Sequence, residues 1–408
     1  MYTQQLTQNL SAAVDLLKNE QRFKSERELQ GGQGPVVKLK NQEVIMLAAN
    51  NYLGLANHPV IKKAAQDIVE KYGFGMSSVR FICGTQDLHR RLEKRLAKFL
   101  GTEDAMLFSS CFAANEGFFA TLINEPFGQT DYIDAVYSDQ LNHASIIDAL
   151  RLVKNQIIEK KVYAHADTAE LSRLLNEDKT KNFRHKIIAT DGVFSMEGDL
   201  APLPELIKLA QEHQALLFVD DSHGVGAIGP NGKGAAEELN VLGQVDVLSG
   251  TLGKALGGAA GGYLAGKQAM IDFLRQKSRP YIFSNSLPPI IAGATLAALD
   301  LIESNNDLIK KLAKNTYYFR EQIKALGFTI IDGSHPIIPV MLGEAAVAQE
   351  MSQQLLANGL YVIGLWFPVV PQGQARLRVQ ISAAHTKTHL DQALAIFKKV
   401  GREMKIIN

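Results

Sequence analysis

The sequence has little cysteine, little net charge and no long hydrophobic run. Its 408 residues include two cysteines, Cys83 and Cys111, which are too few for a disulfide framework and favour a reducing compartment. Neither belongs to a CxxC pair and no HExxH motif is present, so we expect no metal site. Its 43 Lys and Arg nearly balance 42 Asp and Glu, for a formal charge of +1, which argues against nucleic acid or an anionic membrane as the main partner.

Segments typical of membrane or secreted proteins are also missing. The apolar stretches are interrupted well short of a membrane span, and residues 1–6 lack the basic start and apolar run of a signal peptide. We therefore expect a compact, soluble, cytoplasmic protein. The chain is long enough, and at 46% hydrophobic residues apolar enough, for two or three packed domains.

Short apolar runs alternate with helical patterns through the middle of the chain. Residues 216–219 (Leu-Leu-Phe-Val) are apolar without alternation, which is typical of a strand buried on both faces. Such alternation predicts an α/β fold in which a large, mainly parallel sheet of about seven strands lies between helices. The expected strands are 105–109, 133–138, 156–163, 185–191, 215–220, 245–249 and 262–265.

The pattern changes at both ends of this region. Residues 1–55 predict an N-terminal arm, with a helix over 3–28 and a hairpin over 36–47. We assign residues 56–290 to a large cofactor-binding domain and residues 291–408 to a smaller C-terminal α+β domain. In the latter we expect helices near 290–303, 306–326, 344–358 and 386–400, and strands near 327–331, 337–341 and 375–380.

One lysine lies in a glycine-rich segment, residues 249–258 (Ser-Gly-Thr-Leu-Gly-Lys-Ala-Leu-Gly-Gly). Burial lowers the pKa of a lysine that has few charges around it, and a neutral amine can form a Schiff base with an aldehyde cofactor. Lys254 is therefore a candidate catalytic residue, although the segment also fits a surface loop. The spacing does not match a Walker A motif, so a nucleotide-binding P-loop is not expected.

Polar residues also follow the predicted strand that ends at Asp220. Ligands of open α/β sheets bind at the carboxyl ends of strands, where a carboxylate can keep a pyridine nitrogen protonated. His223 is three residues further on and could hydrogen-bond the phenolic oxygen of such a ring. The alternative is an ordinary turn with a structural histidine.

Three other loops at strand-to-helix junctions carry candidate ligands. Ser110 and Cys111 open a helix, where backbone N–H groups and a hydroxyl suit a phosphate; a plain N-cap serine is the alternative. A small residue at this site explains Cys111 as well as a nucleophilic role does. His143 could stack on a flat ring or be structural, and Ser195 could donate to the ring oxygen or be a turn serine.

Arg376 and Arg378 lie two residues apart on a predicted strand, so their side chains share one face. An arginine binds a carboxylate through two parallel hydrogen bonds, which makes this pair a candidate substrate site. A pair of surface arginines is the alternative.

Together these segments resemble the α-oxoamine synthases, a family of fold-type I pyridoxal-phosphate enzymes. The resemblance is carried by residues 49–54, 220–223, 250–258 and 281–286, and it extends over about 45–400. Three longer segments are similar to the glycine C-acetyltransferases of that family: 74–89, 278–288 and 367–376.

The resemblance implies pyridoxal 5′-phosphate as cofactor. Lys254 would be the Schiff-base lysine and proton shuttle, and Asp220 would pair with the pyridine nitrogen. His143 would stack on the ring, while His223 and Ser195 would contact the ring oxygen. The residues implied at the phosphate are Ser110, Cys111, Phe112 and Thr251.

It also implies a homodimer with shared active sites, because Ser284 and Asn285 would serve the partner's cofactor. Arg378, helped by Asn50, would hold the carboxylate of glycine. The expected reaction condenses glycine with acetyl-CoA to 2-amino-3-oxobutyrate and CoA, or runs in reverse in threonine breakdown. Alternatives are an 8-amino-7-oxononanoate synthase or serine palmitoyltransferase activity, a pyridoxal-phosphate aldolase or aminotransferase, and a non-enzymatic scaffold.

Overall fold

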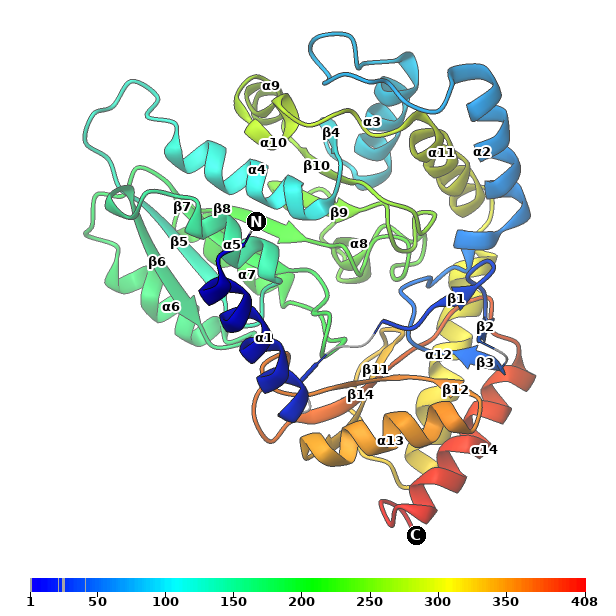
Figure 1. Ribbon diagram of the computed structural model, residues 1–408. Coiled ribbons are helices and arrows are strands. Elements are labelled where there is room, and N and C mark those ends of the chain that lie inside the picture. The colour runs from blue at the N-terminus through cyan, green and yellow to red at the C-terminus, as the bar shows by residue number, and fades with distance from the viewer. Residues whose placement is uncertain (1, 21, 24–25, 41) are drawn as a thin grey trace.

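The computed structural model describes the whole chain except residues 1, 21, 24, 25 and 41. Its centre is a seven-stranded sheet with the order β4-β10-β9-β8-β7-β5-β6 (Figure 1). β10 runs antiparallel to both of its neighbours, and the other strands run in one direction. The predicted α/β fold with a mainly parallel sheet is confirmed. The strands are β4 (Asp104–Phe108), β5 (Asp134–Asp139), β6 (Ile158–Tyr163), β7 (Lys186–Asp191), β8 (Leu216–Asp220), β9 (Val247–Thr251) and β10 (Gly262–Gly266).

Helices cover both faces of this sheet. Consecutive residues of one strand belong to different hydrophobic clusters. On β5, Tyr137 is in one cluster and Val136 in the other; on β7, Ile188 is in the first and Ile187 in the second. Both faces are therefore core, which explains the apolar runs without alternation. The helices around the sheet are α2 (Pro59–Tyr72), α3 (Asp87–Leu100), α4 (Cys111–Asn124), α5 (Ala144–Arg151), α6 (Thr168–Glu177), α7 (Leu203–Glu212), α8 (Ala235–Glu238), α9 (Gln268–Lys277) and α10 (Arg279–Ile282).

Two smaller sheets join the ends of the chain. β1 (Leu29–Gln30), β2 (Val36–Leu39) and β3 (Gln42–Met46) form a sheet with β12 (Leu360–Tyr361), so the N-terminal hairpin pairs with a C-terminal segment. A three-stranded sheet contains β11 (Ile337–Gly343), β14 (Ala375–Gln380) and β13 (Ile363–Leu365). The helices of this part are α11 (Pro289–Ser304), α12 (Asp307–Ala325), α13 (Ala345–Ala357) and α14 (Lys387–Glu403). The domain bounds at 55 and 290 stay a prediction.

One predicted strand is wrong. Residues 327–331 form no strand, and the segment makes an isolated bridge between Ile330 and Val340. Gly327 has a φ of +98°, a left-handed conformation typical of the residue that follows a helix, so the segment begins as the turn after α12 and not as a strand.

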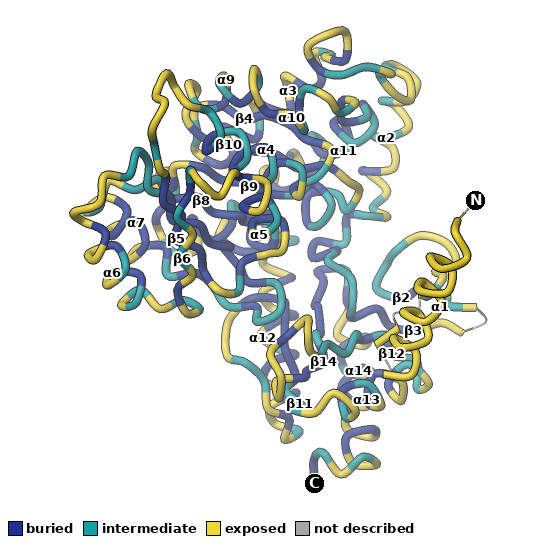
Figure 2. The backbone as a smooth tube through the Cα atoms, turned by 60° about the vertical axis from the view of Figure 1, so that its left-hand side comes forward, coloured by how far each residue is buried: buried dark blue, intermediate teal, exposed yellow. Residues whose placement is uncertain are grey.

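The N-terminal helix is shorter than predicted. α1 covers Gln4–Asn19 rather than 3–28, and residues 21, 24 and 25 of the predicted helix lie outside the described residues. Figure 2 shows α1 exposed along its length, and Leu6 and Leu10 are among its exposed apolar side chains. Within the described residues, no helix combines the length and apolar character needed to cross a membrane.

An ion-paired histidine joins two loops that lead to candidate site residues. His165 donates from Nδ1 to Asp139 (3.1 Å), which ends β5, and from Nε2 to Asp199 (2.8 Å), which follows β7. Burial opposes a charged ring, but hydrogen bonds to Asp139 and then Asp199 outweigh it and raise the pKa of His165 to about 10. The protonated ring of His165 therefore connects the loop after β5 with the loop after β7 through two charged hydrogen bonds.

Replacing His165 with glutamine should cost stability in a pH-dependent way. The histidine pKa in the unfolded chain is about 6.5, so the stabilisation is complete below that pH and is lost as pH rises towards 10. We expect His165→Gln to lower the free energy of unfolding by roughly 1–3 kcal/mol at pH 6 and much less at pH 10.5. Urea denaturation at both pH values measures this. A difference that does not change with pH would mean that His165 acts by packing on Phe194 rather than by charge.

Candidate active site

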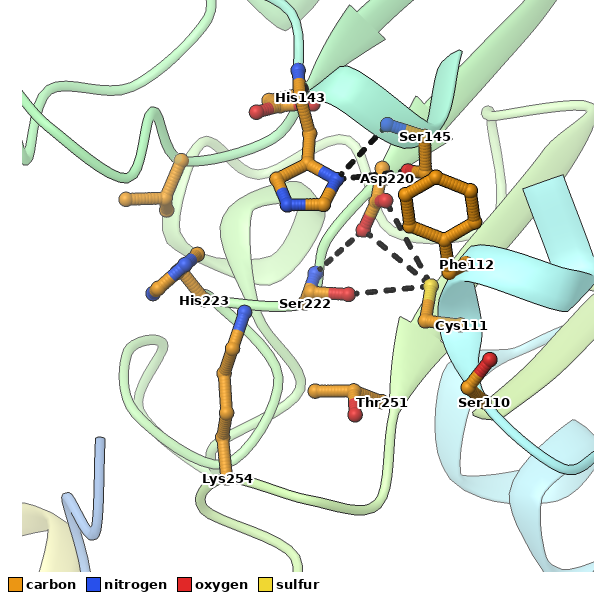
Figure 3. A pocket seen from close by; sticks show the side chains of 12 residues that line it. Ser110, Cys111, Phe112, His143, Ser145, Asp220, Ser222, His223, Thr251 and Lys254 are labelled. Carbon is orange, nitrogen blue, oxygen red and sulfur yellow. Dashed lines mark hydrogen bonds between the residues drawn. The ribbon is translucent and has the colours of Figure 1, made fainter. Parts of the chain in front are cut away.

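A cavity of about 220 Å³ lies at the carboxyl ends of the parallel strands (Figure 3). Eight of the predicted site residues line it, although they come from four separate segments of the chain. They are Ser110, Cys111, Phe112, His143, Asp220, His223, Thr251 and Lys254. The remaining lining residues are Ser145, Asp191, Val193 and Ser222.

Lys254 enters the cavity from the loop after β9. Within the described part of the chain, its Nζ has no hydrogen bond or salt bridge. Burial lowers the pKa of Lys254, while the carboxylate of Asp220 partly opposes this effect. A buried amine with a lowered pKa and no protein partner can exchange protons with a ligand or add to a carbonyl.

The carboxylate of Asp220 is held at the end of β8 by several donors. Asn115 Nδ2 lies 2.6 Å from Oδ2, and the Ser222 backbone N–H donates to Oδ1 at 3.0 Å. The Cys111 thiol lies 3.6 Å from Oδ2. Burial is the main cause that raises the pKa of Cys111 well above its ordinary value, and the negative charge of Asp220 adds to it. The thiol therefore stays protonated and is a poor nucleophile.

His143 caps the N-terminus of α5 with its own ring. Its Nδ1 accepts from the Ser145 backbone N–H (3.2 Å) and lies 2.7 Å from Ser145 Oγ. Burial lowers the pKa of His143, so the ring is neutral at pH 7. Figure 3 shows this ring at the cavity near Phe112; the two rings are 6.3 Å apart and close to perpendicular.

His223 is oriented by a tyrosine that sequence analysis left without a role. Tyr52 Oη lies 2.8 Å from His223 Nδ1. Burial raises the pKa of Tyr52 and lowers that of His223 well below its ordinary value, so both groups are neutral. Within the described residues the Tyr52 hydroxyl has no other acceptor, so it donates to Nδ1. The hydrogen of the neutral ring is then on Nε2. No sequence signal near residue 52 indicated this contact, which joins residues 171 positions apart.

The start of α4 has the features of an anion site. Ser110 is the N-cap and accepts from the Ala113 N–H at 3.1 Å, which leaves the N–H groups of Cys111 and Phe112 without helical partners. The Thr251 hydroxyl, in contrast, donates to the Gly261 carbonyl at 3.2 Å. Both the N-cap and the phosphate interpretations of Ser110 therefore fit one geometry.

The two arginines of β14 have different surroundings. Arg376 is fully buried and donates to Glu197 (3.0 Å) and to the Met196 carbonyl (3.1 Å), so it is not a surface residue. Arg378 donates from Nη1 to the Ser195 carbonyl (3.1 Å), and its buried Nε has no partner. Arg378 thus keeps a donor for a ligand.

Asn50 is the other predicted substrate residue, and its Oδ1 is also buried without a partner. Neither Asn50 nor Arg378 lines the 220 Å³ cavity. The charge of Arg378 nevertheless contributes to the lowered pKa values of Lys254 and His223, which places it near them.

Other predicted residues lie apart from the cavity. The side chain of Ser195 does not line it, and the backbone carbonyl of Ser195 faces Arg378 instead. Ser284 is half-buried and Asn285 is exposed, in a segment after α10 that bridges to Val79. The roles assigned to Ser195, Ser284 and Asn285 stay predictions.

Asp191 is a second cavity carboxyl that sequence analysis did not assign. It pairs in register with Asp220 at the ends of neighbouring parallel strands, so both side chains lie on the same face. Burial is the main cause that raises the pKa of Asp191 well above its ordinary value, and the negative charge of Asp220 adds to it. Its place at the end of a predicted strand was the signal that could have identified it.

The chain matches the family described as aminotransferase class I and II over residues 42–397. It is 48% identical over 407 residues to 2-amino-3-ketobutyrate coenzyme A ligase of Escherichia coli strain K12, with 100% of this chain and 99% of that one covered. The mitochondrial protein of that name from Homo sapiens is 45% identical over 400 residues, covering 98% and 93%. The chain therefore belongs to the aminotransferase class I and II family.

More distant relatives share the fold. An 8-amino-7-oxononanoate synthase of Bacillus subtilis is 41% identical over 398 residues, with 98% of each chain covered. Among solved structures, a serine palmitoyltransferase from S. paucimobilis with a bound PLP–myriocin aldimine is 30% identical, with a TM-score of 0.89 and 100% of both chains covered.

Proposed function

We propose that this protein condenses glycine with acetyl-CoA to 2-amino-3-oxobutyrate and CoA, or catalyses the reverse cleavage, with pyridoxal 5′-phosphate as cofactor. One observation carries the proposal: a buried lysine amine, a carboxylate and a helix N-terminus meet in one cavity. The chain that builds this cavity is 48% identical over its full length to a 2-amino-3-ketobutyrate coenzyme A ligase.

The residues present fit this cofactor. Lys254 would bind the aldehyde carbon, Asp220 the pyridine nitrogen and the start of α4 the phosphate. His143 would lie against the ring face, and Nε2–H of His223 is available to the phenolic oxygen. When bound, pyridoxal phosphate supplies an electron sink that stabilises negative charge at the α-carbon of an amino acid.

The side chains of this protein account for binding and proton transfer. Arg378 would hold the glycine carboxylate, since its buried Nε–H donor has no partner. Asn50 would help through its amide nitrogen, because its unpaired Oδ1 is an acceptor and cannot bind a carboxylate. Lys254 would take the proton from the glycine α-carbon, because its amine faces the cavity and its pKa is lowered by burial. The carbon–carbon bond then forms at the acetyl carbonyl, the carbon–sulfur bond breaks, and CoA leaves as the thiol.

We also propose that two copies assemble with shared sites and that the protein acts in the cytoplasm. Ser284 and Asn285 lie outside the cavity of their own chain, which supports a role towards a second copy. The exposed apolar side chains of α1 support a further contact between copies. Size-exclusion chromatography with light scattering tests the assembly, and a purely monomeric active protein would contradict it.

A close backbone approach makes the phosphate assignment testable. A Cβ added to Gly262 on β10 would lie 2.2 Å from the Cys111 backbone nitrogen, so Gly262→Ala must displace the first turn of α4. We expect this variant to bind pyridoxal phosphate about 10–100-fold more weakly, by absorbance titration of cofactor-free protein. Gly34→Ala is the matched control, since its Cβ would meet its nearest neighbour at 3.6 Å. Equal affinity in both variants would remove α4 from the phosphate site.

The function is tested by release of free CoA from the purified protein. Glycine with acetyl-CoA should give fast release, and a long-chain acyl-CoA or serine and alanine should give much less. Preference for a longer acyl chain or another amino acid would move the activity towards that of the relative named 8-amino-7-oxononanoate synthase or of the palmitoyltransferases. No release from any pair would direct attention to aldol cleavage and transamination.

A further inference from the structure

A chain of buried hydrogen bonds joins Asp220 to His143 through two residues that have no assigned role. Asn115 on α4 donates from Nδ2 to Asp220 Oδ2 (2.6 Å) and to Ser145 Oγ on α5 (2.8 Å). Ser145 Oγ lies 2.7 Å from His143 Nδ1. Asn115 is fully buried and does not line the cavity, so it acts on a ligand through its neighbours.

The orientation of the Asn115 amide follows from its surroundings. A reversed amide would place its oxygen against the Asp220 carboxylate, where two acceptors would repel each other. In the observed orientation both amide hydrogens are used, and Oδ1 faces the weakly donating Cys111 thiol at 3.9 Å. The amide therefore donates to both Asp220 and Ser145.

This orientation determines where the His143 proton lies. Because Ser145 Oγ accepts from Asn115, its own hydrogen can point to His143 Nδ1. The Ser145 backbone N–H also points to Nδ1, at 3.2 Å, as the dashed lines of Figure 3 show. A nitrogen that accepts two hydrogen bonds carries no proton, so the neutral ring has its hydrogen on Nε2.

We propose that Asn115 is a positioning residue that couples the two cofactor-facing groups: it holds the Asp220 carboxylate and, through Ser145, keeps His143 as the Nε2–H tautomer. Its effect on catalysis rests on the proposed function, whereas its effect on the tautomer does not. With its proton fixed on Nε2, the His143 ring keeps one orientation and one charge state in the cavity. The Asp220 carboxylate likewise keeps one orientation.

The tautomer of His143 is measured by NMR in cofactor-free protein labelled with ¹⁵N-histidine. The protein has ten histidines whose signals must be resolved. His143→Gln assigns the signal. At pH 7.5 the parent should show a protonated Nε2 and an unprotonated Nδ1. Asn115→Leu removes both donor bonds at similar volume, and Ser145→Ala, a milder change, removes the hydroxyl. Both should raise the share of Nδ1–H, and Ser145→Thr should restore the parent pattern.

Kinetics separate positioning from binding. Asn115→Leu should lower kcat for CoA release about 10–100-fold, with KM for glycine changed little, because supporting hydrogen bonds act on groups that are already in place. Asn124→Leu on the same helix is the matched control and should leave both readouts unchanged. A parent His143 protonated on Nδ1 would overturn the proposal, as would an unchanged tautomer in both Asn115→Leu and Ser145→Ala. If the tautomer responds but no substrate pair releases CoA, the coupling holds and the proposed function fails.

Discussion

Replacing Lys254 with alanine is expected to lower the rate of CoA release from glycine and acetyl-CoA by about 10³-fold or more. The amine enters the cavity, has no protein partner among the described residues, and has a pKa lowered by burial. Alanine leaves no group there to move the α-carbon proton or to bind the cofactor aldehyde. The measurement is the initial rate of thiol release at saturating substrates, together with the absorbance spectrum of the loaded protein.

Lys267→Ala is the control for this experiment. Lys267 is exposed before α9, away from the cavity, and its removal should leave the rate unchanged. If Lys254→Ala kept more than about a tenth of the parent rate, the amine would not be the proton acceptor, and the mechanism proposed above would be wrong.

Replacing Asp220 with asparagine is expected to lower the same rate by about 10²–10³-fold while leaving the cofactor bound. Asparagine keeps the shape of the side chain and an acceptor for Asn115, but it removes the charge that would keep the pyridine nitrogen protonated. The expected result is a coloured protein with slow turnover. Rates and absorbance spectra from pH 6 to pH 9 measure both properties.

Asp148→Asn is the control, because Asp148 lies on α5 in a surface ion pair with Arg151 and away from the cavity. Loss of cofactor from Asp220→Asn would show that the carboxylate contributes mainly to binding. A rate equal to that of the parent would remove Asp220 from the reaction.

Local patterns in the sequence singled out eight of the residues that line the cavity, while the roles given to them stay predictions. Asp220 ends a fully apolar run, and His143 and Ser110 each precede a helix. Because parallel strands end at one edge of the sheet, residues in these positions meet without any knowledge of their contacts. The strand wrongly predicted at 327–331 shows the limit of such patterns, since Gly327 takes a left-handed conformation that composition does not reveal.

Contacts between residues far apart in the chain could not be predicted from the sequence. The alternation of side chains along a strand placed Arg376 and Arg378 on one face. It could not show that Arg376 donates to Glu197, whereas the Nε–H of Arg378 has no partner. Asn115 lies in the middle of a helix, and nothing near it in sequence indicates a partner 105 residues away.

By itself, the sequence determined the α/β fold, the order of strands and helices, and the residue types at the strand ends. These follow from hydrophobic periodicity and turn residues, which act over a few positions. Only the tertiary structure shows which donors hold Asp220, which tautomers His143 and His223 adopt and that burial lowers the pKa of Lys254. Those properties depend on groups from different strands and helices, and packing into one core brings them within hydrogen-bond distance.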